Sequence, residues 1–294
     1  MQTDDTNLSN VTFSMNVDTN AGTLTIPQYG GAITLAGRES KIIVTNYAFG
    51  QSVLQYSTAE VMTWTTIDDI DVIVLYALAG QQTETVVQST ATNVTLTQSS
   101  SAISSNVVNG TVVLSGSPNG ISVAQFGRVK VIVMDKATAG TLWNPRLTAS
   151  TYDLSPRQSS VLIGGPYLVR NATISGSTIS IFGDIKATGT LSVVAPASVN
   201  TVLFNGATVS GTTDAAGVFS GSVSDSIGTV TVPTLTTAAW SCADTLPEVA
   251  TSFDDSTWVV ANKTETHRPF QPTAGKVCIR LAVVVMQNQN DLIC

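Results

Sequence analysis

The sequence predicts an all-β protein, and three features support this prediction. Short runs rich in Val, Ile and Thr recur along the chain, and β-branched side chains favour a pleated strand. Gly, Asn, Asp and Pro separate these runs, as is typical of turns between strands. No segment combines sustained helical periodicity with helix caps. The expected strands include Thr23–Pro27, Ala32–Leu35, Lys41–Tyr47, Asp71–Leu78, Thr111–Leu114, Val129–Met134, Thr178–Phe182, Thr201–Phe204 and Thr229–Val232.

Local patterns fix the geometry of individual strands and turns. Within Thr178–Phe182, Ile179 and Ile181 fall on one face and the polar residues on the other, because side chains alternate along a strand. Asn205-Gly206 follows a strand and predicts a two-residue type I′ hairpin turn, since both residues tolerate a positive φ. Asp68-Asp69 is expected to form a second, acidic turn between strands.

Composition excludes several classes of protein. The 294 residues carry a net charge of −7. A chain with this negative charge lacks the basic surface that nucleic-acid binding requires. Hydrophobic residues make up 43% of the chain, but the longest apolar runs, Asp71–Ala79 and Val277–Met286, are shorter than the ~18 residues of a membrane-spanning helix. We therefore expect a globular chain with no nucleic-acid or membrane partner.

Candidate nucleophiles and metal ligands are scarce. The single histidine, His267, would have to serve any Ser- or Cys-based triad, and its Arg-Pro neighbourhood favours a solvated loop. Cys242, Cys278 and Cys294 show no zinc-binding spacing and are interpreted as free or fortuitously paired thiols. We predict no catalytic residue, no cofactor and no metal site in this chain.

Two acidic features allow a functional and a structural interpretation. Glu60 lies between apolar residues and is either a buried acid with a raised pKa or a hydrogen-bonded structural carboxylate, and we favour the second. Asp68, Asp69 and Asp71 could hold calcium, but they do not supply the six or more oxygen ligands of a known loop. An acidic hairpin turn is the favoured interpretation of this cluster.

Six N-x-[ST] sequons occur, a small excess over the roughly four that this Ser- and Thr-rich composition gives by chance. They are compatible with secretion without proving it. The candidate N-glycosylation sites are Asn93, Asn109, Asn171 and Asn262, and two further sequons lie at Asn7 and Asn10.

Domain boundaries are expected at two changes in composition. The stretch Asn144–Gly165 carries two prolines and few strand signals, which is typical of an interdomain connection. Acidic residues become denser after Trp240, where the regular strand pattern ends. The predicted fold is two antiparallel β-sandwich-type domains in tandem, at residues 1–158 and 159–239, followed by a shorter segment at 240–294.

Several long motifs resemble the non-catalytic β domains of fungal secreted β-galactosidases of glycoside hydrolase family 35. The resemblance covers about residues 1–268, with motifs in the order of the family. Those similar to its second domain are residues 22–27, 35–42, 56–64, 72–76, 129–135 and Trp143-Asn-Pro145. Those similar to its third domain are residues 165–170, 184–188 and 204–206, and residues 240–248 and 253–258 resemble the entrance to its fourth, a jelly roll.

The resemblance implies a part of a β-galactosidase, an enzyme that hydrolyses terminal β-D-galactosyl residues. The activity of the family lies on a (β/α)₈ barrel that carries two glutamates, and this sequence has no stretch that could form the barrel. No residue here inherits either catalytic role, including Glu60 and Glu248. The barrel, normally in cis, and galactose-containing carbohydrate are therefore the implied partners, and the isolated chain is expected to be inactive.

Two other implications concern location and the C-terminal segment. The resemblance implies an extracellular location. The N-terminus of this chain, Met1-Gln-Thr-Asp-Asp, shows no basic region followed by an apolar region, so no signal peptide is expected in it. Residues 240–294 are expected to be a truncated start of the jelly roll, with a divergent tail from about residue 271. The alternative functions are a carbohydrate-binding or structural β module and a capsid-like β protein, which matches the composition but not the motifs.

Overall fold

A computed structural model describes residues 9–19, 22–98, 102–147, 160–224, 240–242, 254, 256 and 259–261. The described chain is built from β-strands, which confirms the predicted fold class. Within these ranges the sole helix is a single turn, and no (β/α)₈ barrel is present. The chain divides into two units, residues 1–225 and 226–294. The expected strands up to residue 204 are all present in the first unit, and Thr229–Val232 lies outside the described residues.

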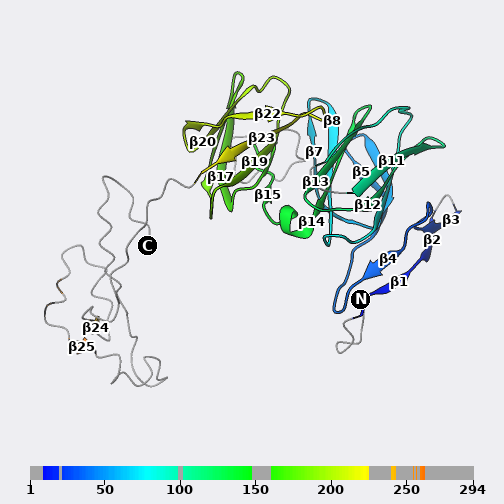
Figure 1. Cartoon of the computed structure of the whole chain (residues 1–294), viewed down its shortest axis with the longest axis horizontal. Helices are drawn as coiled ribbons and strands as arrows, with labels where there is room; N and C mark the ends of the chain where they lie inside the picture. The colour runs from blue at the N-terminus through cyan, green and yellow to red at the C-terminus, as the bar shows by residue number, and fades with distance from the viewer. Residues whose placement is uncertain are drawn as a thin grey trace. The chain divides into compact units, whose positions relative to one another are not determined.

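The first sandwich consists of two five-stranded sheets (Figure 1). Apolar side chains of both sheets form one core, in which Phe49, Leu54 and Val87 of one sheet meet Ile73 and Phe126 of the other. The first sheet has the order β11 (Ala102–Val108), β12 (Thr111–Ser117), β9 (Thr83–Gln88), β6 (Ser52–Ser57), β5 (Val44–Phe49). The second has the order β10 (Thr95–Gln98), β13 (Ile121–Phe126), β14 (Val129–Asp135), β8 (Ile70–Ala77), β7 (Glu60–Ile67).

The centre of the second sheet is buried on both faces. Strands β8 and β14 pair in parallel, whereas their other neighbours are antiparallel. All seven residues of β14 are buried, which explains its almost unbroken apolar sequence. Along β8, Ile73 and Leu75 face the core of the first sandwich, while Val72 and Val74 face a different cluster on the opposite side. A second layer must therefore cover that opposite side.

The N-terminal segment covers the outer face of the first sheet. Ile26 and Ile33 are almost fully buried against Tyr56, Val86 and Val113 of that sheet. The segment contains two separate strand pairs, β1 with β4 and β2 with β3. Its strands are β1 (Val11–Phe13), β2 (Met15–Thr19), β3 (Gly22–Ile26) and β4 (Ile33–Leu35).

The second sandwich follows α1 (Lys136–Ala139), for which Asp135 is the N-cap: its carboxylate accepts hydrogen bonds from the amides of Ala137 and Thr138. Residues of its two sheets, including Ile163, Leu191, Ile179 and Ile181, form one core. One sheet has the order β15 (Leu142–Trp143), β16 (Leu162–Gly164), β19 (Gly189–Val194), β23 (Val218–Val223), β22 (Gly211–Thr213). The other has the order β17 (Leu168–Ser175), β18 (Thr178–Asp184), β20 (Thr201–Phe204), β21 (Ala207–Thr208), with β18 and β20 parallel.

Both predicted hairpin turns are confirmed. Asn205 and Gly206 have φ values of 50° and 82°, and they join β20 to β21 with Phe204 opposite Ala207. Asp68 and Asp69 have φ values of 50° and 59°, and they join β7 to β8 with Ile67 opposite Ile70. Positive φ at both central residues matches the right-handed twist of the flanking strands. Ile179 and Ile181 are both fully buried, as their alternation predicts.

The expected boundary at 158/159 falls within residues 148–159, outside the described residues. On one side of that gap, β15 already pairs with β16 of the second sandwich. In the second unit, β24 (Trp240–Cys242) pairs with β25 (Val259–Ala261). The expected divergent tail from about residue 271 lies outside the described residues.

Candidate functional site

The two sandwiches of residues 1–225 meet along a shared apolar seam. Val72, Val74 and Ile132 project from the outer face of β8 and β14, and they pack in one cluster with Leu162 and Val194 of the second sandwich. Each of these five side chains is at least nine-tenths buried. Burial of this kind stabilises by about 25 cal/mol per Å² of apolar surface, so the seam couples the two sandwiches energetically.

Polar contacts border the apolar seam. The hydroxyls of Thr65 and Ser160 hydrogen-bond to each other in a buried position. The amide of Asn144 donates to the Thr63 hydroxyl at 3.2 Å. Both hydrogen bonds join a threonine of β7 to a residue that follows α1 in the sequence. They therefore attach β7 to the second part of the chain beside the apolar seam.

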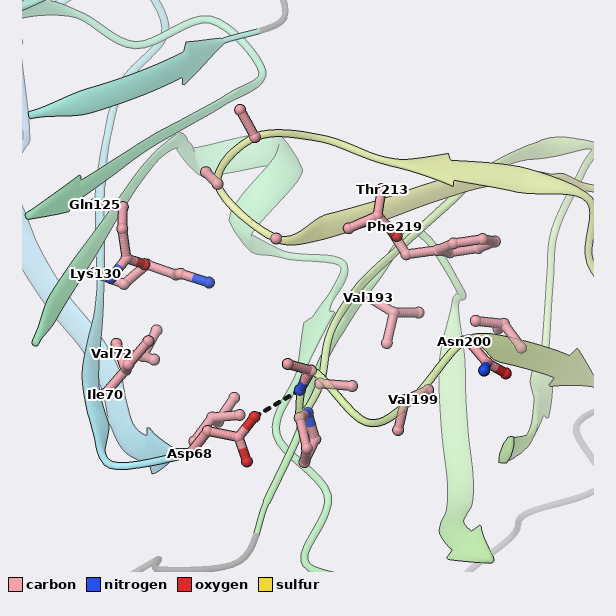
Figure 2. A pocket seen from close by; sticks show the side chains of 18 residues that line it. Asp68, Ile70, Val72, Gln125, Lys130, Val193, Val199, Asn200, Thr213 and Phe219 are labelled. Carbon is pink, nitrogen blue, oxygen red and sulfur yellow. Dashed lines mark hydrogen bonds between the residues drawn. The ribbon is translucent and has the colours of Figure 1, made fainter. Parts of the chain in front are cut away.

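A pocket of about 530 Å³ opens beside this seam (Figure 2). Its walls come from the β7–β8 turn, β13 and β14 on one side, and from the β19–β20 loop and the β22–β23 hairpin on the other. The Asp68 carboxylate accepts a hydrogen bond of 2.6 Å from the amide of Ala197, which joins the two sides. Val193, Val199 and Phe219 supply apolar wall.

Lys130 is the charged group that faces this pocket most directly. It lies on β14 with only 7% of its surface exposed, and Figure 2 shows its side chain extending between the two walls. Burial lowers the pKa of the Lys130 ammonium, and the negative charges of Asp214 and Asp68 oppose this shift. Gly217 approaches Lys130 closely: a Cβ there would lie 3.4 Å from Nζ, and its φ of +75° also disfavours a side chain.

The structure assigns Glu60 a structural contact. Its carboxylate accepts a 3.0 Å hydrogen bond from the amide of Ile42. Nearby, the Lys41 ammonium donates to the Gln81 side chain at 2.5 Å, and burial lowers its pKa against the opposing charges of Glu39 and Glu60. Burial raises the pKa of the Tyr76 hydroxyl, and the neighbouring Glu60 adds to this effect. Glu60 thus helps to attach the segment after β4 to the sandwich.

The three aspartates of the predicted acidic turn have separate partners. Asp68 accepts from Ala197, as described above, while the backbone carbonyl of Asp69 accepts from the Arg128 guanidinium at 2.9 Å. Asp71 is fully buried and accepts from the Gln51 amide and the Ser52 hydroxyl at 2.9 and 2.7 Å. Among the described residues, no group of three or more His, Cys, Asp or Glu side chains is arranged to hold a metal ion.

Glu84 is a key buried residue that the sequence analysis missed. The residue is 2% exposed, and its carboxylate accepts hydrogen bonds from the Tyr56 hydroxyl and from the amides of Gln28 and Tyr29, the last two at 2.7 and 3.1 Å. Burial and the adjacent Glu84 raise the pKa of Tyr56, which keeps its hydroxyl a donor. The signal in the sequence is an acid between two threonines, followed directly by two valines, in a short β-rich run.

Three of the four candidate glycosylation sites are described, and all three are exposed. Asn93 lies in the loop before β10, Asn109 in the β11–β12 turn and Asn171 on β17. Asn262, His267, Cys278 and Cys294 lie outside the described residues, and Cys242 is described only as part of strand β24. No helix in the described ranges has the length and apolarity needed to cross a membrane.

Fold and seam together define a tandem β-sandwich protein. Residues 1–142 match the family model "Beta-galactosidase, domain 2", and residues 143–220 match "Beta-galactosidase, domain 3". The chain is 35% identical to Beta-galactosidase A of Penicillium sp. over 88% of its length and 36% identical to Beta-galactosidase A of Aspergillus niger over 86%. It is 37% identical to Probable beta-galactosidase B of Penicillium rubens over 90%. The chain belongs to the β-galactosidase family and carries its accessory domains 2 and 3.

The chain spans about a quarter of the length of these curated relatives, 26% in each case. Strand β14 with Asp135, the N-cap of α1, lies in the part that matches domain 2, whereas the second sandwich from Trp143 of β15 to Ser220 of β23 lies in the part that matches domain 3. The seam described above is therefore the contact between these two domains.

Proposed function

We propose that this chain is the accessory β scaffold of a secreted fungal β-galactosidase, which hydrolyses terminal β-D-galactosyl residues. The catalytic (β/α)₈ barrel is its partner, normally in cis, and galactose-containing carbohydrate binds to the intact enzyme. The chain alone is inactive. The observation that carries this proposal is the match of residues 1–220 to two accessory domains, with each buried acid that we described engaged in structural hydrogen bonds.

The seam supports a bracing role. The apolar cluster around Ile132 and the Asp68–Ala197 hydrogen bond hold the two sandwiches against each other. Large apolar interdomain surfaces restrict relative motion, while small polar ones permit it. A rigid pair of domains would give the barrel one fixed support and would shape the approach to its mouth.

The proposal includes the domain division and the cellular location. Residues 1–158 and 159–239 form the two domains, and residues 240–294 form the start of a fourth, jelly-roll domain. In an extracellular enzyme, the exposed side chains of Asn93, Asn109 and Asn171 are available for N-glycosylation, and Asn262 is the fourth candidate. Exposure of the acceptor asparagine is a requirement for a surface glycan.

A chimaeric enzyme tests the scaffold role. We would replace the matching domains 2 and 3 of Beta-galactosidase A of Aspergillus niger with residues 1–220 of this chain. We expect the chimaera to hydrolyse p-nitrophenyl β-D-galactoside with a kcat within about tenfold of the parent, because the barrel is unchanged and the scaffold is equivalent. A parent enzyme that lacks both domains should be inactive or insoluble.

Two controls make the comparison specific. A chimaera in which the barrel nucleophile is replaced must lose all activity, which shows that the barrel performs the reaction. A second chimaera carries Ile132→Asp, which places a charge in the seam, and it should lose activity together with thermal stability. A soluble, folded chimaera without activity would contradict the proposed role.

A further inference from the structure

We propose that an N-glycan on Asn171 packs its first N-acetylglucosamine ring on the exposed side chain of Phe182. The contact would lie on the outer face of β17 and β18 in the second sandwich. The inference rests on the proposed secretion of the enzyme, because N-glycans are attached along the secretory route. It gives Asn171 a structural role beyond that of an exposed acceptor.

The pairing of β17 with β18 places Asn171 directly opposite Phe182. The next pair along the ladder, Ala172 with Ile181, is buried in the core of the second sandwich. Because successive side chains alternate between the two faces of a sheet, Asn171 and Phe182 both point to the outer face. The Cβ atoms of directly opposite residues lie about 4.5–5.5 Å apart, so a sugar attached to Asn171 starts within reach of the Phe182 ring.

Phe182 presents an uncovered ring on this face. It is 47% exposed, and the next outward-facing pair, Thr173 with Ser180, consists of small side chains. Tyr167, also an exposed aromatic of the second sandwich, carries the Lys186 ammonium 4.0 Å from its ring centre. In the part of the chain that the structure describes, no cation lies over the Phe182 ring in this way. A single exposed ring is common on protein surfaces, and what distinguishes this one is the glycan acceptor directly opposite it.

The surroundings of Asn171 leave room for a glycan. Asn171 and Thr173 of the sequon are both exposed, and β17 is the edge strand of its described sheet. The β-bulge before Asn171 contains Arg170, whose guanidinium is held by an ion pair of 2.7 Å with Asp184. Among the described residues, the Asn171 side-chain amide forms no hydrogen bond, so the attachment of a sugar breaks none.

The chemistry of the two groups is complementary. A pyranose presents a face of C–H groups, which is attracted to the negative face of an aromatic ring. Packing also removes part of the apolar surface of Phe182 from water. Because the glycan is covalently attached, the loss of translational freedom that opposes the binding of a free sugar does not arise. We therefore expect the first ring to stabilise the second sandwich.

A double-mutant cycle on the full chain, secreted from a yeast host, tests the contact. Thr173→Val removes the sequon but keeps Asn171, and Phe182→Thr removes the ring but keeps a β-branched strand residue. We expect mass spectrometry to find a glycan on Asn171. Removal of the sequon should lower Tm by about 2–4 °C when Phe182 is present, and by less than about 1 °C in Phe182→Thr. Trimming of the glycan to one N-acetylglucosamine should leave Tm within about 1 °C of the untrimmed protein.

Two controls isolate the sugar. The same four proteins made without glycans in a bacterial host should show no coupling between the two positions, which separates the glycan from a direct contact of Thr173 with Phe182. Thr95→Val removes the sequon of Asn93, which lies in the loop before β10 and has no strand partner in the described residues. Its effect on Tm should be the same with and without the Phe182 ring.

Three results would overturn the proposal: an unmodified Asn171 in the secreted protein, equal losses of Tm with and without the ring, or the same coupling in protein made without glycans. If a variant does not fold, a crystal structure of the trimmed wild-type glycoprotein decides the question. The first sugar against Phe182 supports the contact, and a sugar directed into solvent overturns it. Failure of the scaffold role is distinguishable, because an inactive chimaera leaves the measured coupling unchanged.

Discussion

Glu84→Ala is expected to lower the free energy of unfolding by about 3–4 kcal/mol. The Tyr56 hydroxyl and the amides of Gln28 and Tyr29 all donate to this carboxylate. The substitution removes the acceptor of the buried Tyr56 hydroxyl and of the Tyr29 amide, whereas the Gln28 amide keeps the Tyr56 oxygen as an acceptor at 2.9 Å. The N-terminal segment should then detach first from the outer face of the first sheet. Urea unfolding monitored by circular dichroism measures the loss.

Two variants provide the comparison. Glu84→Gln keeps one acceptor oxygen and should cost less, about 1–2 kcal/mol. Asp184→Ala removes a carboxylate from the exposed ion pair with Arg170, and surface pairs of this kind contribute only about 0–1 kcal/mol. If Glu84→Ala and Asp184→Ala destabilise the protein equally, then Glu84 does not anchor the N-terminal segment.

Ile132→Ala in the seam is expected to lower the free energy of unfolding by about 2–4 kcal/mol. Ile132 is 1% exposed and lies on the face of β14 that packs against the second sandwich, so its truncation leaves a cavity between the two domains. Because both sandwiches bury surface in this cluster, hydrogen exchange should accelerate in β19 and β23 as well as in β8 and β14.

Ile42→Ala is the matched control for the seam. Ile42 is 74% exposed, and its truncation should change the free energy of unfolding by less than about 0.5 kcal/mol. A loss of protection confined to the first sandwich in Ile132→Ala would mean that the seam does not couple the domains.

Local features of the fold could be predicted from the sequence, because short-range geometry determines them. Asn205-Gly206 and Asp68-Asp69 predicted their turns, since few residue pairs accept a positive φ at two successive positions. Alternation placed Ile179 and Ile181 on the buried face. The parallel pairing of β8 with β14 could not be predicted, because their apolar runs show burial on both faces without identifying the neighbouring strand.

The surroundings of Lys130 could not be predicted either, because they also depend on contacts between residues distant in the sequence. Lys130 and Asp214 are far apart in the chain, and only the docking of the β22–β23 hairpin on β14 brings their charges near each other. Glu84 was missed because two of its donors are backbone amides, which leave no trace in residue identity, and its side-chain donor, Tyr56, lies 28 residues away in the sequence. The local role of Glu60 was easier to infer, since an acid within a strand commonly needs a nearby donor.

We propose that this chain has no catalytic machinery of its own, and a hydrolysis assay is the direct test. Purified chain, free of other glycosidases, is incubated with p-nitrophenyl β-D-galactoside at high protein concentration. We expect p-nitrophenol to be released at the rate of buffer alone. Retaining hydrolysis needs two carboxyl groups about 5–5.5 Å apart across the substrate, and the buried acids Glu84 and Asp71 are engaged in structural hydrogen bonds. Saturable hydrolysis that disappears in Glu60→Gln or Glu84→Gln would contradict it.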